Sequence, residues 1–129
     1  MTSIKDIDSF LAEFEILEKT YNRAQEKLLV KKVTDNELYL ECLKYTNNMI
    51  KYLDDLNPFV INRYKEQIKR TYYISAELLV RTVGLNMNRQ NFNDQERNTL
   101  YMAIAHVRKV LLIEPFHRGG MELFKMVFL

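Results

Sequence analysis

Residues 57–84, NPFVINRYKEQIKRTYYISAELLVRTVG, carry a helix start, a helix stop and a helical pattern between the two. The stretch opens with Asn57 and Pro58, a capping residue followed by a proline in the first helical position, where its missing N–H costs nothing. It closes at Gly84, the residue type that most easily takes the left-handed conformation at a helix end. Between them, one stripe recurs at steps of three and four residues, formed by Ile61, Tyr64, Ile68, Tyr72, Ser75, Leu79 and Thr82. The pattern predicts one helix over 58–83, about 40 Å long.

A first helix is predicted upstream over about 3–31. Ser3 is a suitable N-cap, and Asp6 favours the positive end of the helix. Apolar residues alternate at steps of three and four, namely Ile7, Phe10, Phe14, Leu17, Tyr21, Ala24 and Leu28. This heptad spacing indicates a helix that packs nearly parallel to its neighbours. We expect Leu11, Ile16 and Leu29 to widen its buried stripe, as a globular bundle requires.

A second helix is predicted over about 35–55. Thr34 and Glu37 have the spacing of a capping box, in which each side chain accepts from the other residue's backbone N–H. The expected buried side carries Tyr39, Cys42 or Leu43, Thr46, Met49 or Ile50, Leu53 and Leu56. The turn that leads to Pro58 is short, so this helix and the next should be antiparallel neighbours.

Two further helices are predicted after Gly84. Asn93 and Glu96 repeat the capping-box spacing and predict a helix over about 94–114, which Pro115 ends. Gly119 and Gly120 then precede a short apolar helix over about 120–129.

The composition favours an all-α fold. The chain has 129 residues with three glycines and two prolines, too few to punctuate a β-sandwich or an α/β fold. Its length suits one domain of ordinary size. We therefore predict a single domain over 1–129, a helical bundle of four main antiparallel helices plus a short C-terminal helix.

Targeting and compartment are constrained only by general features. A single cysteine excludes an intramolecular disulfide framework and favours a reducing compartment, so we expect a cytoplasmic protein. The first residues show no basic region that leads into an apolar run, so no signal peptide is expected. No stretch approaches the roughly 18 apolar residues of a membrane span, and we expect no membrane partner.

The charge distribution suggests one possible function. Residues 1–60 hold eight basic and eleven acidic residues, a balance of −3, whereas residues 61–129 hold eleven and six, a balance of +5. The two halves either neutralise each other within one bundle or leave a basic face for nucleic acid. Around Gly84 the chain is similar to a helix-turn-helix, although Val80 and Gln90 depart from its usual residues. The candidate nucleic-acid-binding residues are Arg63, Lys65, Lys69, Arg70 and Arg89.

Residues for catalysis or metal binding are few. No phosphate-binding loop, nucleophile elbow or paired-cysteine motif is present. Glu114 and His117 have the Glu-x-x-His spacing of di-iron bundles, but Pro115 between them breaks the helix that this motif needs. We expect Cys42 to be inert packing and His106 to be a partly buried core residue. The sequence therefore predicts neither an enzyme nor a cofactor nor a metal site.

The C-terminal residues carry the strongest functional signal. Seven of the last nine are apolar. An apolar end of this kind closes the bundle of its own chain, completes a dimer, fills a groove on a partner or is the cut edge of a longer protein. The leading hypothesis is an interaction module, such as an adaptor, regulator or inhibitor, that binds another protein or itself. The candidate partner-binding residues are Phe116, Met121, Phe124, Val127 and Phe128.

Overall fold

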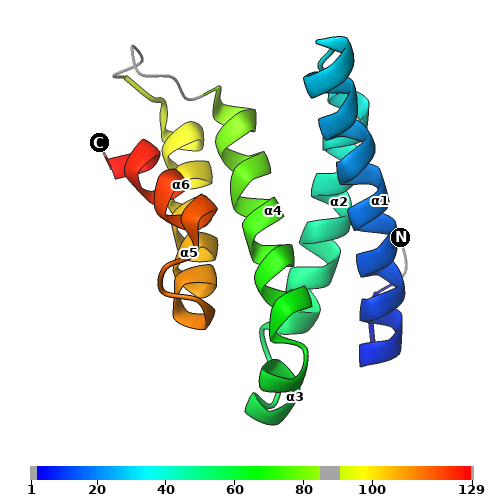
Figure 1. Ribbon diagram of the computed structural model, residues 1–129. Helices are drawn as coiled ribbons and strands as arrows, with labels where there is room; N and C mark the ends of the chain where they lie inside the picture. The colour runs from blue at the N-terminus through cyan, green and yellow to red at the C-terminus, as the bar shows by residue number, and fades with distance from the viewer. Residues whose placement is uncertain (1–2, 85–90, 129) are drawn as a thin grey trace. The chain divides into compact units, whose positions relative to one another are not determined.

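The computed structural model describes residues 3–84 and 91–128, except for the side chain of Phe128. Within these residues the chain forms six helices and no strand, which confirms the all-α prediction (Figure 1). The helices are α1 (Ile7–Lys31), α2 (Asn36–Leu53), α3 (Pro58–Arg63), α4 (Lys65–Val83), α5 (Asp94–Ile113) and α6 (Arg118–Phe128).

The chain divides into two compact units, residues 1–67 and residues 68–129, each described by itself here. The prediction of one domain, and of a single bundle that joins all main helices, stays a prediction.

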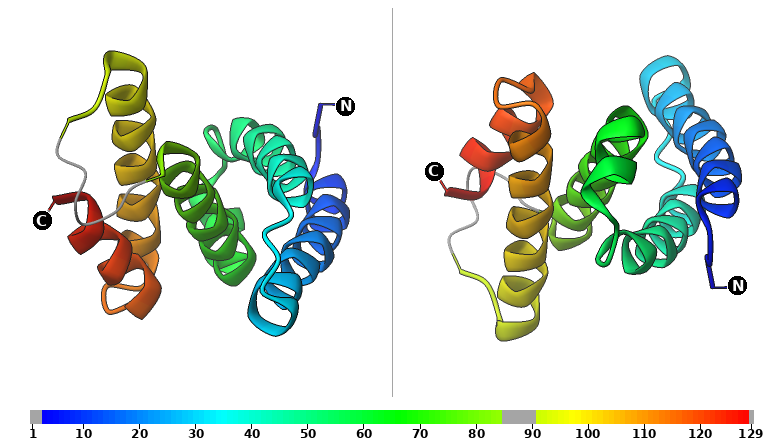
Figure 2. Two further views of the ribbon diagram at one scale, coloured as in Figure 1. Left: turned by 90° about the horizontal axis from the view of Figure 1, so that it is seen from above. Right: turned by 90° about the horizontal axis from the view of Figure 1, so that it is seen from below.

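In the first unit, α1 and α2 form an antiparallel pair (Figures 1 and 2). The heptad spacing located the buried side chains well: Phe10, Leu17, Tyr21 and Ala24 of α1 are buried, as are Tyr39, Cys42, Thr46, Met49 and Leu53 of α2. The expected widening of the α1 stripe is wrong at two positions, since Ile16 and Leu29 are exposed. One narrow seam is therefore the buried side of α1.

Two predicted N-caps are displaced along the chain. Helix α1 begins at Ile7 because the carboxylate of Asp6, not the hydroxyl of Ser3, accepts from the backbone N–H of Ser9, at 2.8 Å. Helix α2 is capped by Asp35, which accepts from the N–H of Leu38 at 3.1 Å, in place of the predicted box at Thr34. In both cases a nearby aspartate, an equally strong capping residue, takes the position.

The end of α1 has an unusual backbone conformation. Lys32 follows the last helical residue with φ 57° and ψ 30°, which is the left-handed region. The N–H groups of Lys32 and Val33 both bond to the carbonyl of Lys27, so the chain leaves the helix in a tight turn. Glycine is the usual residue in such a turn, because a Cβ destabilises this conformation.

The helix predicted over 58–83 is interrupted at Tyr64. Its start is confirmed, because Pro58 is the first helical residue and the side-chain oxygen of the N-cap Asn57 accepts from the N–H of Phe59 at 2.8 Å. At Tyr64, however, the backbone turns to φ −113° and ψ 28°, outside the helical range, and α3 ends there. The residues just before it include the β-branched Val60 and Ile61, which support a helix only weakly.

In the second unit, α5 runs antiparallel to α4, and α6 folds back along α5 (Figure 1). The predicted capping box of α5 is confirmed, with Asn93 and Glu96 exchanging both bonds. Gly84 closes α4 with φ 68°, also as predicted. Helix α6 begins two residues earlier than expected, at Arg118, because His117 supplies the bonds that start it.

Candidate interaction surface

The predicted partner-binding residues lie on α6 and on the turn before it. Met121 is 38% exposed and Phe124 40%, while Phe116 in the turn is 85% exposed. Met126, another apolar residue of α6, is 50% exposed. We call Phe116, Met121, Phe124 and Met126 the C-terminal surface. Val127 is half-buried, and the side chain of Phe128 lies outside the described parts.

The opposite side of α6 packs within its own unit. Leu123 is 6% exposed, and Gly120 is buried close to Val110 and Leu111 of α5. Gly119 faces the ring of Tyr73 on α4, and a Cβ built on this glycine would lie only 2.7 Å from the tyrosine Cζ atom. The two glycines therefore allow the first turn of α6 to approach α4 and α5 closely, as the absence of a Cβ permits.

His117 forms the junction between α5 and α6. Its backbone carbonyl accepts from the N–H of Met121, at 2.9 Å, and its ring Nδ1 accepts from the N–H of Gly120, also at 2.9 Å. These are the bonds of an N-cap, made by an imidazole in place of the usual hydroxyl, amide or carboxylate. The ring also lies 5.0 Å from the ring of Tyr73, centre to centre.

An ion pair joins α4 to the end of α5. Lys69 Nζ lies 2.7 Å from Glu114 Oε1, and the lysine side chain is only 10% exposed whereas that of the glutamate is 47% exposed. The hydrogen bond from Lys69 lowers the pKa of the Glu114 carboxyl below its usual value. The burial of Lys69 was not predicted, and its long aliphatic stem explains how a lysine fits beside apolar neighbours.

The candidate nucleic-acid-binding residues are divided between the two units. Arg63 and Lys65 are exposed in the first unit. In the second, Lys69 is buried against Glu114 and Arg70 is half-buried, with its guanidinium 5.9 Å from the centre of the Tyr73 ring. Arg89 lies outside the described residues. The buried Lys69 therefore does not contribute to an exposed basic face.

A serine–histidine pair lies between α4 and α5. Ser75 Oγ is 2.9 Å from His106 Nδ1, and the His106 ring lies 5.5 Å from that of Tyr72. Such a pair supplies the nucleophile and base in many hydrolases. Here Ser75 has no exposed surface, so a substrate carbonyl has no approach to its oxygen. His106 is half-buried, as predicted, and its bond to Ser75 satisfies a polar group inside the unit.

The described residues contain no group of three metal-ligating side chains. Glu114 is the C-cap of α5 and His117 precedes α6, so the Glu-x-x-His spacing does not place both residues on one helix face. Cys42 is fully buried in the first unit, as expected for a packing residue.

A second group of exposed apolar residues surrounds the connection between α1 and α2. Leu29 is 68% exposed and Val30 71%, and Val33 and Leu40 are exposed as well. The sequence analysis missed this group because Leu29 was assigned to the core. The available signal was the run of three consecutive apolar residues directly before the lysine pair 31–32.

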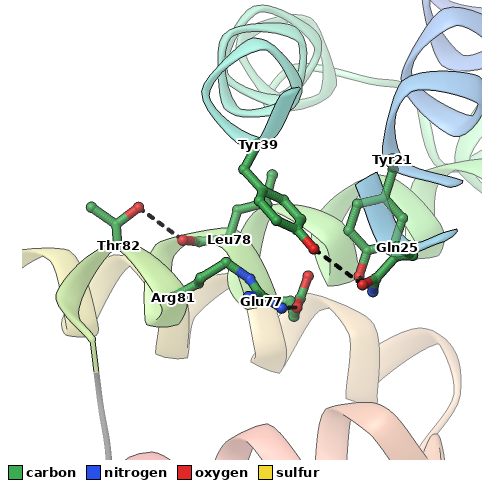
Figure 3. A network of polar contacts seen from close by, with 7 residues as sticks. All are labelled: Tyr21, Gln25, Tyr39, Glu77, Leu78, Arg81 and Thr82. Carbon is green, nitrogen blue, oxygen red and sulfur yellow. Dashed lines mark hydrogen bonds and ion pairs between the residues drawn. The ribbon is translucent and has the colours of Figure 1, made fainter. Parts of the chain in front are cut away.

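Polar contacts of the two helical units are drawn in Figure 3. In the first unit, the Tyr39 hydroxyl of α2 points toward Gln25 of α1 and donates to its Oε1 at 3.2 Å, while Gln25 Nε2 donates to the Tyr21 hydroxyl at 2.7 Å. In the second, Arg81 pairs with Glu77 along α4 at 3.0 Å. These bonds stabilise the helices and their packing and bring no reactive groups together.

Comparisons with known proteins give no relative for this chain: no family model, no curated protein and no solved structure matches it. Within the described residues, no helix has both the length and the apolar character that crossing a membrane requires.

Proposed function

We propose that this chain is a non-enzymatic protein–protein interaction module, an adaptor, regulator or inhibitor, that acts through the C-terminal surface, with a second copy of itself as its first partner. One observation carries the proposal: α6 buries Leu123 against its own unit and still exposes Met121, Phe124 and Met126 on its other sides. A helix whose apolar residues extend beyond its buried stripe presents surface that gains from a partner.

The charges beside these residues favour a protein as the partner. Arg118 and Glu122 form an exposed ion pair at 3.6 Å, so both signs are present on α6, whereas nucleic acid and anionic lipid select for positive charge alone. In an antiparallel pairing centred between Leu123 and Phe124, Glu122 lies level with Lys125 of the second copy. Opposite charges then meet across an apolar contact, which supports self-association.

Other parts of the chain give less support to the competing functions. The complete burial of Ser75 argues against hydrolysis by the Ser75–His106 pair. The alternative is nucleic-acid binding through the basic second half. It is weakened because Lys69, one of its candidate residues, pairs with Glu114. Phosphate binding weakens steeply with salt and an apolar interface responds little, so the salt dependence of any binding separates the two.

The test is the solution mass of the full chain, measured by light scattering over a range of concentrations. We expect a mass that approaches twice the 15.5 kDa of one chain. Replacing Phe116 and Met121 together by serine should restore the monomer.

The matched control is Phe59→Ser, because Phe59 is 86% exposed, as Phe116 is 85% exposed, but lies in the first unit. This variant should remain a dimer. A wild-type monomer at every concentration, or a dimer that survives the double replacement, would refute self-association through this surface.

A further inference from the structure

The junction between α5 and α6 is held by a group that can change its charge. The Gly120 N–H can only donate a hydrogen bond, so the ring Nδ1 of His117, 2.9 Å away, must present a lone pair to it. Nδ1 is therefore unprotonated, and the imidazole is neutral when it caps α6. Serine, threonine and asparagine caps have no such condition, because they do not titrate in the range where histidine does.

Protonation reverses the interaction at this point. An imidazolium carries N–H on both ring nitrogens, so Nδ1 would face the Gly120 N–H as a second donor and the bond would be lost. The positive ring would also lie at the first turn of α6, where the helix dipole already disfavours cations. Both effects act against the start of the helix.

The charged and titratable groups around His117 come from all three helices of the unit. On α5, the Glu114 carboxylate favours the imidazolium, but Lys69 of α4 already engages it at 2.7 Å. On α4, Arg70 is a second cation, and burial raises the pKa of the Tyr73 phenol, which therefore stays neutral. On α6, Arg118 and Glu122 pair with each other. This set holds three cations and two carboxylates, so it does not favour the imidazolium, and the bond to Gly120 is the contact that protonation breaks.

We propose that His117 is a protonation-controlled N-cap, which holds α6 on α4 and α5 when it is neutral and loosens α6 when it is protonated. The contacts that α6 would give up are those of its first turn, Gly119 against Tyr73 and Gly120 against α5. This inference goes beyond the proposed function and does not rest on it. Protonation of His117 would alter the position of the helix that carries the C-terminal surface, whatever that surface binds.

The composition of the chain makes the proposal easy to test by NMR. The three glycines are Gly84, Gly119 and Gly120, so selective ¹⁵N-glycine labelling of the full chain gives one amide signal for each. In a pH titration of the full chain, we expect the Gly120 signal to move with the same midpoint as the His117 ring protons. Gly84, which has nothing within 4 Å of its Cβ position, serves as the internal reference.

Two variants separate the cap from a general effect of acid. His117→Asn retains a cap that does not titrate, so the movement of the Gly120 signal should disappear. His106→Asn removes the other histidine of the chain and should leave that movement unchanged. A Gly120 signal that stays fixed while His117 titrates, or that still moves in His117→Asn, would overturn the proposal.

Hydrogen exchange then measures the loosening of α6 itself. Loss of an N-cap typically changes a helix equilibrium by roughly fivefold. After correction for the intrinsic rate, amides of residues 118–128 should therefore exchange about fivefold faster at the acid end in the wild type than in His117→Asn. Equal rates in the two proteins would contradict the proposal. If His117→Asn fails to fold, the wild-type titration alone decides, since the Gly120 and His117 midpoints must coincide.

Discussion

Lys32 and Gly84 offer a matched test of backbone strain, because both follow a helix in the left-handed conformation, with φ 57° and φ 68°. Lysine at position 32 is disfavoured in this conformation because it carries a Cβ, whereas glycine at position 84 is the residue that adopts it most easily. We predict that Lys32→Gly stabilises the chain relative to Lys32→Ala, and that Gly84→Ala destabilises it relative to the wild type.

The magnitude follows from two opposing contributions. A left-handed residue with a Cβ costs about 1–2 kcal/mol. Glycine recovers this amount but has more freedom in the unfolded chain, which offsets about 0.5–1 kcal/mol. The net difference between glycine and alanine at position 32 should therefore be about 0.5–1 kcal/mol in favour of glycine. The comparison with alanine removes the effect of the lysine charge, which suits the helix end.

The assay is urea unfolding followed by circular dichroism, with the midpoint compared at a constant slope. At Gly84 a Cβ meets nothing within 4 Å, so Gly84→Ala reports the backbone conformation without a clash. Should Lys32→Gly prove no more stable than Lys32→Ala, the strain assigned to Lys32 is refuted.

Three further predictions concern packing and charge. Gly119→Ala should destabilise the second unit by about 1–2 kcal/mol in urea unfolding, because overpacking against the Tyr73 ring outweighs the gain in helix propensity, and the loss should shrink in a Tyr73→Leu background. Phe10→Ala should cost about 3–5 kcal/mol in the same assay, since Phe10 is fully buried, and a loss below ~1 kcal/mol would contradict its place in the core. The Lys69–Glu114 pair lowers the pKa of Glu114 in the folded state, so the pair stabilises the fold above the usual glutamate pKa of 4.5 and loses this effect as pH falls below that value. Glu114→Gln should therefore reduce the loss of unfolding free energy at acid pH. An unchanged dependence of stability on pH would argue against the pair.

The periodicity of the sequence predicted the buried sides of the long helices well. Steps of three and four residues identified Phe10, Leu17 and Tyr21 because the helical repeat alone fixes which side chains share a face. Capping was predicted by residue type but not always by position. Asp6 replaced Ser3 since several polar residues stand together there, and propensity ranks them almost equally.

Features that depend on three-dimensional packing were not predicted. The interruption at Tyr64 contains neither proline nor glycine, and the weak helix propensity of Val60 and Ile61 is too common inside helices to predict it. The burial of Lys69 depends on a contact between separate helices, and the cap at His117 is made by a residue type outside the usual capping set. For the candidate surface, the sequence indicated apolar residues on the last helix, and Met121, Phe124 and Met126 are exposed there. The exposed group near Leu29 was not predicted.

The hydrogen bonds of Gln25 have a consequence for how the first two helices align. A seam that repeats every seven residues allows two helices to slide by one heptad and still bury apolar side chains. Gln25 bonds to Tyr21 on its own helix and to Tyr39 across the pair, using both ends of one amide. A slide of one heptad would keep the bond between Gln25 and Tyr21 but break the bond between Gln25 and Tyr39, which opposes the slide. The Gln25 amide therefore adds to the short connection between α1 and α2 in favouring one register of the apolar seam.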